Sequence, residues 1–205
     1  MASRRLSIFP LGRAILFPRM HLPLHIFEPR YRALISDAMA RDQRIGMIQP
    51  RMSDDPLALF DMGCIGRIID VQALEDGRYN IVLEGEARFR VGSERDVTTP
   101  FRQIDASPMT PEEDDPGILA SSERAALEAE SRRFADKLGY GVDWDAVARL
   151  DDETFVNAIA QVGPFDIAAK QALLEANLLS DRSEMLIQLM EFQGRSDRPG
   201  SSTFQ

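Results

Sequence analysis

The sequence contains only two lysines, two histidines, one cysteine and one tryptophan among its 205 residues. Because Cys64 is the only cysteine, the chain cannot form an intramolecular disulfide or a metal cluster from its own cysteines. Neither Lys137 nor Lys170 follows a glycine, so a phosphate-binding loop of the Gly-x-x-x-x-Gly-Lys type is absent. These absences exclude a P-loop nucleotidase and a disulfide-stabilised domain.

Long apolar runs are missing as well. No stretch approaches the ~20 apolar residues that a membrane-spanning helix needs. The apolar segment 6–24 is interrupted by prolines, a glycine and basic residues, which makes it a poor signal-peptide core. A lone cysteine also suits a reducing compartment. We therefore expect a cytoplasmic protein without a membrane partner.

Negative charge is in excess and is unevenly placed. The net charge is −9; residues 1–111 hold 15 basic and 14 acidic side chains, whereas residues 112–205 hold 9 basic and 19 acidic ones. Phosphate contacts supply most non-specific affinity for nucleic acids, so an acidic chain binds them poorly. Nucleic acid is not expected as a partner, although the near-neutral first half weakens this argument locally.

Residues that carry catalysis or bind metals lack the required patterns. His21 and His25 are four residues apart, but Pro23 between them argues against the helix that would bring both to one metal, so we predict two loop histidines. Each lysine lies on a predicted helix in acidic surroundings, where its pKa should not fall. Cys64 lies in a strand-like run and is predicted to be a buried, unreactive thiol. The sequence predicts no catalytic residue, no metal and no cofactor.

The first half of the chain reads mostly as strands. Alternating or β-branched apolar runs predict strands at 6–9, 45–48, 65–74, 79–84, 87–91 and 101–104. Asp76-Gly77 between two such runs predicts a hairpin. One helix interrupts the strands, because the apolar residues from Tyr31 to Met39 follow a helical period and Pro29 lies near the first turn.

The second half reads as helices. Residues 108–116 contain three prolines and four consecutive acids, which predicts a solvated linker. Helices are predicted at 118–138, after an Asp151 cap, at 167–176, and from a Ser180 cap to Gly194. The predicted organisation is α+β, with a β domain at 1–107, a linker at 108–116, a helical subdomain at 117–194 and a flexible tail at 195–205.

Five segments carry a resemblance to a known family. In the first, four prolines stand among large apolar residues between Ile8 and Tyr31; the others are Gly63–Ile68, Asp76–Tyr79, Leu83–Val91 and Lys170–Glu175. Over roughly residues 6–193 the chain resembles the N-terminal, substrate-binding domain of the Lon protease family. The resemblance implies a PUA-like β pseudo-barrel followed by a small helical bundle. Arg19 departs from it, because the family commonly has glycine after Phe-Pro.

The function that this resemblance implies is non-catalytic binding of protein. The chain ends after the resembling region, so we expect a standalone form without the ATPase and peptidase domains of Lon. Unfolded or partly folded polypeptides, or a protease or chaperone, are the expected partners. Apolar loop residues suit recognition of apolar segments, which makes Phe17, Met20, Met52 and Leu57 candidate contacts. They could instead cover one end of the barrel as core.

A second hypothesis is recognition of structured RNA, because PUA-like domains also bind RNA. A surface cluster of five arginines would support it: Arg13, Arg19, Arg30, Arg32 and Arg51.

Three polar residues form a further candidate motif. Glu28 and Arg30 flank Pro29; they could anchor a ligand, or Glu28 could cap the helix while Arg30 pairs with Glu84 or Glu86. Arg88 shares a strand face with Arg90 and could bind an anion or form cross-strand pairs on a solvated face.

Overall fold

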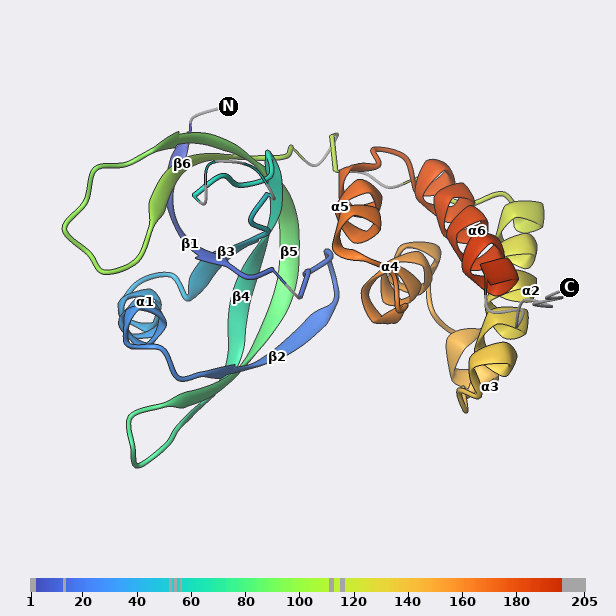
Figure 1. The fold of residues 1–205 in the computed structure, drawn as a ribbon, viewed down its shortest axis with the longest axis horizontal. Helices are drawn as coiled ribbons and strands as arrows, with labels where there is room; N and C mark the ends of the chain where they lie inside the picture. The colour runs from blue at the N-terminus through green and yellow to red at the C-terminus, as the bar shows by residue number, and fades with distance from the viewer. Residues whose placement is uncertain are drawn as a thin grey trace, which may run out of the picture. The chain divides into compact units, whose positions relative to one another are not determined.

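The computed structural model divides the chain into two compact units, Met1–Asp115 and Pro116–Gln205, which we call the barrel unit and the helical unit (Figure 1). The structure describes residues 3–12, 14–51, 53, 55, 57–110, 113–114 and 117–196, without the side chains of 195 and 196. No helix in these ranges has the length and apolar character needed to cross a bilayer.

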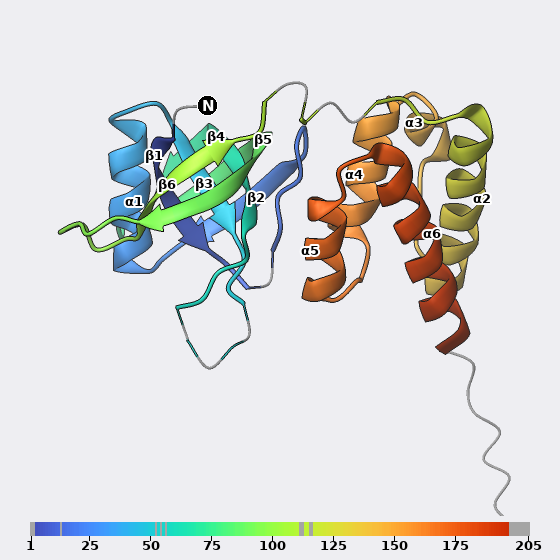
Figure 2. The ribbon, with the colours of Figure 1, turned by 90° about the horizontal axis from the view of Figure 1, so that it is seen from above.

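The barrel unit is built on one six-stranded sheet. Its strands are β1 (Arg4–Pro10), β2 (His21–Ile26), β3 (Arg44–Ile48), β4 (Met62–Ala73), β5 (Tyr79–Glu94) and β6 (Gln103–Pro108). Their order is β2-β5-β4-β3-β1-β6, and β6 also pairs with β5. Five strands therefore close into a barrel, and β2 is attached outside it (Figure 2). All pairs are antiparallel except β1 with β3.

The long strand β5 makes this closure possible. Residues 79–84 pair with β2, whereas residues 89–94 pair with β6. The sequence predicts two strands here, separated at Gly85, but the structure has one continuous strand. The predicted hairpin before β5 is confirmed: Gly77 has a φ of 78°, which glycine adopts without a steric penalty, and its N–H donates to Leu74 O at 2.9 Å.

Strand β2 is not predicted from the sequence: His21 and His25 are expected in a loop, because Pro23 argues against a helix. That expectation is wrong, since both histidines lie on β2. Gly85 N donates to Met20 O at 2.9 Å, and such bonds recur at every second residue of an antiparallel pair. Pro23 faces Val82, three positions further along, so its missing N–H falls on the outer edge of β2. An edge strand tolerates proline at such a position.

One helix packs against the barrel core. Helix α1 (Pro29–Met39) buries Tyr31, Leu34, Ile35 and Ala38, and Pro29 occupies its first turn as predicted. The rings of Phe9 and Tyr31 lie 4.1 Å apart between centroids, and the Tyr31 hydroxyl donates to Pro10 O at 3.3 Å. Burial raises the pKa of the Tyr31 hydroxyl.

Five helices make up the helical unit: α2 (Ser121–Leu138), α3 (Trp144–Val147), α4 (Asp152–Val162), α5 (Ile167–Glu175) and α6 (Leu179–Ser196). Helices α2 and α6 lie side by side (Figure 2). The predicted Asp151 cap is confirmed, because its carboxylate accepts from Thr154 N at 2.9 Å. Two details differ from the prediction: α3 was not expected, and α6 begins at Leu179 and continues through Gly194.

A buried arginine joins three of these helices. Arg182 on α6 is 2% exposed. Its guanidinium donates to Leu173 O at 2.8 Å, to Asn157 Oδ1 at 2.5 Å and to Ala176 O at 3.1 Å. Because these acceptors lie on α4, on α5 and at the end of α5, one side chain fixes the relative positions of α4, α5 and α6.

Candidate functional site

The four predicted apolar contacts do not form a common surface among the described residues. Phe17 is fully buried, and Met20 packs half-buried against the barrel core. Leu57 is exposed, with 63% of its surface accessible. Met52 lies outside the described residues. Phe17 and Met20 therefore contribute to the core in this structure, which was the alternative interpretation of these loop residues.

Backbone contacts explain why Phe17 is buried. Arg19 N donates to Gly85 O at 2.8 Å, and Gly85 N donates to Met20 O, so the Phe17–Met20 turn is bonded to the middle of β5. A Cβ atom on Gly85 would lie 2.1 Å from Phe17 O, so only glycine permits this close approach. Arg19 adopts a φ of 62° in the same turn. Its departure from the family's glycine therefore falls at a position whose backbone favours glycine.

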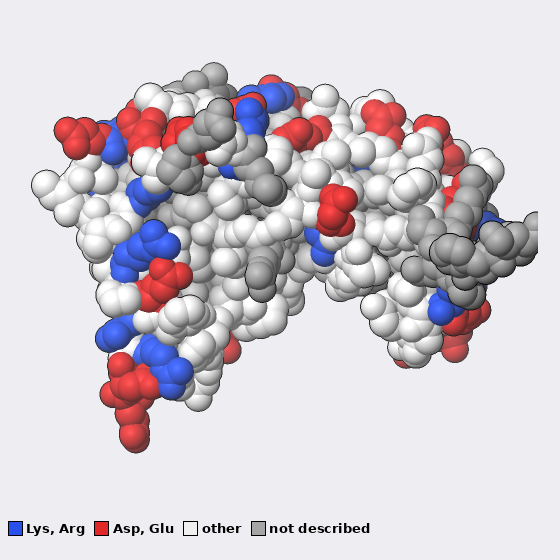
Figure 3. Space-filling model, viewed as in Figure 1, with Lys and Arg blue, Asp and Glu red and all other residues white. Residues whose placement is uncertain are grey.

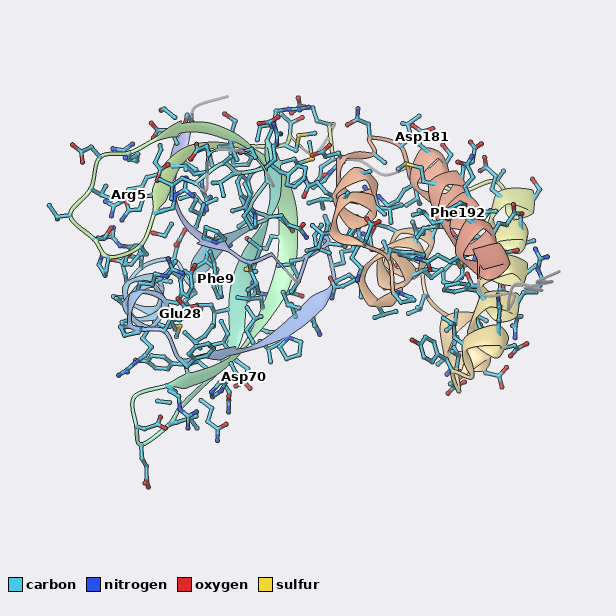
Figure 4. The ribbon with its side chains drawn as sticks, in the orientation of Figure 1. Arg5, Phe9, Glu28, Asp70, Asp181 and Phe192 are labelled. Atoms are coloured by element: carbon cyan, nitrogen blue, oxygen red, sulfur yellow. The ribbon has the colours of Figure 1, made fainter. Side chains whose placement is uncertain are left out.

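The Glu28–Arg30 motif forms a local pair at the beginning of α1 (Figure 4). Arg30 Nε donates to Glu28 Oε2 at 2.9 Å, and the guanidinium lies 4.5 Å from the centroid of the Tyr31 ring. Glu28 occupies the N-cap position but makes no side-chain capping bond. The expected pairing of Arg30 with a strand acid is wrong, because Glu84 and Glu86 pair with Arg67 and Arg44 instead.

Arg88 has a structural environment that the sequence prediction missed. Strand alternation predicted a solvated face, but the residue is 1% exposed. Its Nε donates to Asp114 Oδ1 at 2.5 Å, and its backbone N–H donates to Asp114 Oδ2 at 3.2 Å. The described part of the predicted linker is therefore attached to the barrel: Pro108 ends β6, Met109 is buried, and Asp114 binds Arg88.

The arginines named for RNA recognition do not form a shared surface in the described part of the chain. Arg30 pairs with Glu28, and Arg51 pairs with Asp61. Arg19 and Arg30 lie beyond opposite ends of β2, and Arg13 is outside the described residues. Figure 3 shows basic and acidic side chains interspersed over the visible face of the barrel unit. No observation here favours the RNA hypothesis.

The two histidines are too far apart to share a metal ion, and the cysteine is buried. His21 and His25 are exposed on β2, where four residues span ~13 Å, too far for one metal. Burial raises the pKa of the Cys64 thiol, which is 1% exposed. The described residues contain no cluster of three or more His, Cys, Asp or Glu side chains that could hold a metal.

One expectation about the lysines is wrong. Burial lowers the pKa of Lys170, contrary to the prediction from its acidic neighbours. Its Nζ donates to Gln161 O at 2.6 Å, near the end of α4. A cation on carbonyl groups at a helix C-terminus stabilises the helix, so this contact gives Lys170 a structural role.

The helical unit contains an apolar pocket, which we call the helical pocket. Its volume is about 170 Å³. Its wall includes five aromatic residues, Phe134, Tyr140, Trp144, Phe155 and Phe165, and Val162. Ser131 also lines the pocket, but its hydroxyl donates to the helix backbone, at Leu127 O, over 2.7 Å. Almost all of the pocket surface is apolar, so it offers an occupant almost no hydrogen-bonding partner.

Neighbouring contacts hold the walls of the helical pocket in place. The rings of Phe134 and Phe165 stack with centroids 6.2 Å apart. Arg124 lies over the Phe155 ring at 4.8 Å and pairs with Asp152 at 2.6 Å, which ties α2 to α4. At the surface, Tyr140 is 55% exposed and Val162 is 75% exposed. The pocket is thus preformed and open to an apolar group from outside.

Comparison with known proteins agrees with this fold. The sequence model of the ATP-dependent protease La (LON) substrate-binding domain matches residues 5–191, and the chain belongs to this family. Two relatives are Lon protease of Haemophilus influenzae, 27% identical over 92% of this chain, and Lon protease 1 of Bdellovibrio bacteriovorus, 28% identical over 92%. The chain spans only 24% and 25% of their respective lengths.

Solved structures give the same fold. A Lon N-terminal domain protein from Xanthomonas campestris superposes with a TM-score of 0.69 at 21% identity, covering 90% of this chain and 98% of that one. The N-terminal domain of Mycobacterium avium complex Lon protease also gives 0.69, at 19% identity, covering 95% of this chain and all of that one. The predicted α+β fold and the predicted family are confirmed.

Proposed function

We propose that this chain is a non-catalytic, polypeptide-binding module that receives exposed apolar side chains of unfolded or partly folded proteins in the helical pocket. The observation that carries this proposal is the pocket itself, with aromatic walls and an opening beside the exposed Tyr140 and Val162. Burial of apolar surface is the main favourable term in such association. The name of the family, a substrate-binding domain, supports the same function.

The surroundings of the reactive residue types support binding over catalysis. The Cys64 thiol is buried, Lys170 Nζ donates to a carbonyl at the end of α4, and Lys137 Nζ donates to Gly194 O. None of these groups is paired with a described nucleophile or general base. A protease or chaperone that receives the bound polypeptide is the proposed partner.

Fluorescence anisotropy tests the proposal. A labelled, permanently unfolded polypeptide would be titrated with the protein across a salt series, with its folded form and a structured RNA as controls. We expect selective binding of the unfolded chain and a shallow dependence on salt. RNA binding that collapses with salt would favour the alternative function, and no binding of any probe would refute both.

A matched pair of substitutions connects binding with the pocket. Ala158 lines it, so Ala158→Leu fills part of its volume and should weaken binding of the unfolded chain about tenfold. Ala168→Leu adds the same atoms at an exposed position on α5 outside the pocket wall and should leave binding unchanged. Equal effects of the two substitutions would contradict a role for the pocket.

A further inference from the structure

The size of the helical pocket restricts what it can hold. An apolar cavity of ~150 Å³ admits one benzene molecule. The helical pocket, at about 170 Å³, therefore has room for one aromatic ring but not for two. Its aromatic walls, which include Phe134, Trp144 and Phe165, suit offset or edge-to-face contact with such a ring.

The charges beside the pocket restrict the neighbours of that ring. Asp143 lies between the wall residues Val142 and Trp144, and Asp145 follows Trp144. Asp166 directly follows the wall residue Phe165. The carboxylates of Asp143 and Asp166 accept helix-capping bonds from Ala146 N and Ala169 N, and the described residues provide no ion pair for any of the three acids.

Most cations beside the pocket are engaged in ion pairs. Arg132 lies over the Trp144 ring at 4.5 Å and pairs with Glu128 at 2.6 Å, so its charge is already balanced. Arg124, which lies over the Phe155 ring, pairs with Asp152, and Arg133, next to the wall residue Phe134, pairs with Glu130. Arg149, next to the wall residue Leu150, is the one of these cations without an ion pair to a described residue. The helical unit as a whole has 9 basic and 15 acidic side chains in residues 116–205. The surroundings of the pocket are therefore complementary to a basic segment.

From these observations we infer that the helical pocket selects one aromatic side chain that is flanked by basic residues in an extended polypeptide. This inference rests on the proposed function and adds the class of segment that is bound. The apolar walls supply affinity for the ring, while Asp143, Asp145 and Asp166 favour arginine or lysine on either side of it. The same acids disfavour segments with flanking aspartate or glutamate.

Trp144 provides a direct readout, because it is the only tryptophan of the chain and forms part of the pocket wall. Its fluorescence would be followed while three unstructured peptides without tryptophan are added. The first has a phenylalanine with two arginines on each side. The second has glutamates in place of the four arginines, and the third keeps the arginines but has alanine in place of phenylalanine. At low salt we expect the first peptide to bind at least about fivefold more tightly than the other two.

Two double variants test the charges. Asp143→Asn with Asp166→Asn removes two charges beside the pocket and keeps both helix caps, because asparagine caps as well as aspartate. Asp181→Asn with Glu184→Gln removes two exposed charges from the first half of α6, where Asp181 is labelled in Figure 4. The wall residue Met190 lies in the second half of the helix. Only the first pair should reduce the preference for arginine flanks, by about twofold to fourfold.

The outcomes separate the inference from the proposed function. If the unfolded polypeptide binds but the three peptides bind alike, or both double variants act alike, the inference is overturned and the proposed function stands. If the alanine peptide binds as well as the phenylalanine peptide, charge attraction alone explains the binding, and the inference that the pocket selects an aromatic side chain is overturned. If neither the unfolded polypeptide nor any peptide binds, the proposed function fails and the inference fails with it.

A second pocket-filling variant is available in case Ala158→Leu does not fold: Val147→Phe would fill the pocket from α3 instead.

Discussion

Arg88 and Asp114, 26 residues apart, form a nearly buried ion pair in the barrel unit, with Arg88 Nε 2.5 Å from Asp114 Oδ1. The pair joins β5 to the acidic segment that follows β6. Removing one partner of a buried pair leaves an uncompensated charge away from water, which is far more costly than removing both.

Asp114→Ala should therefore reduce the free energy of unfolding of the barrel unit by about 3 kcal/mol. The double variant Arg88→Met/Asp114→Ala should recover a substantial part of this loss. Urea denaturation followed by amide hydrogen exchange of β5 measures both values, because Trp144 lies in the helical unit and does not report on the barrel unit. A loss below about 1 kcal/mol for Asp114→Ala would show that solvent already screens the pair.

The protein should be more stable with glycine at position 19 than with alanine there. The φ of 62° at this position costs about 1 kcal/mol for any residue with a Cβ atom, and only glycine removes that cost. Arg19→Ala deletes the long side chain but keeps the Cβ, so it is the matched control. We expect Arg19→Gly to exceed Arg19→Ala by about 1 kcal/mol in thermal or urea denaturation; equal stabilities would mean that the turn relaxes.

Replacing the amide side chain of Gln49 with an apolar one should stabilise the barrel unit. The Gln49 side chain is 2% exposed, and among the described residues neither its Nε2 nor its Oε1 has a hydrogen-bond partner. An unsatisfied buried polar group costs about 1–3 kcal/mol, and methionine has a similar shape. Gln49→Met should raise the free energy of unfolding by about 1 kcal/mol.

Gln103→Met is the comparison for Gln49, because Gln103 also has a buried Oε1 without a partner among the described residues, but its Nε2 donates to Thr99 Oγ1 at 3.1 Å and that bond would be lost. Gln103→Met should therefore not stabilise the protein. A gain of the same size for both variants would attribute the effect to methionine itself.

Cys64 should be unreactive in the folded protein. Burial raises the pKa of its thiol, and the thiolate is the reactive form, so a thiol reagent should label it only on unfolding. Because the folded pKa lies above the unfolded value of about 8.5, the contribution of this thiol to stability is full below that pH and declines as the pH rises above it.

Denaturation between pH 7 and pH 10 should show this decline, and Cys64→Ala should make it shallower. Labelling of the native protein at neutral pH, at a rate comparable to that of the unfolded chain, would refute the buried assignment.

Much of the fold was predictable because it follows from local pattern. Asp76-Gly77 predicted the hairpin, and the apolar stripe from Tyr31 to Met39 predicted α1. Strand β2 was missed because the tolerance of Pro23 depends on which edge of β2 is left unpaired. That edge is set by pairing with β5, more than fifty residues further along the chain.

The candidate site was less predictable, for a different physical reason. Apolar spacing in 131–165 indicates side chains that face a core, but it does not show which of them the fold leaves uncovered. Trp144 and Tyr140 carried the strongest available signal, since large aromatic residues lie there in the short segment between the two predicted helices that became α2 and α4. Phe17 gave the opposite error: a loop residue beside proline became buried because Gly85 allows the backbone to approach β5.

The pairing of β1 with β6 has a consequence for synthesis of the chain. Arg4 faces Ala106, so β1 cannot complete its hydrogen bonds until β6, about 100 residues later in the chain, has been made. At 5–20 residues per second, β1 keeps one unpaired edge for roughly 5–20 s. For that interval the nascent barrel unit itself presents the kind of open, apolar segment that chaperones bind.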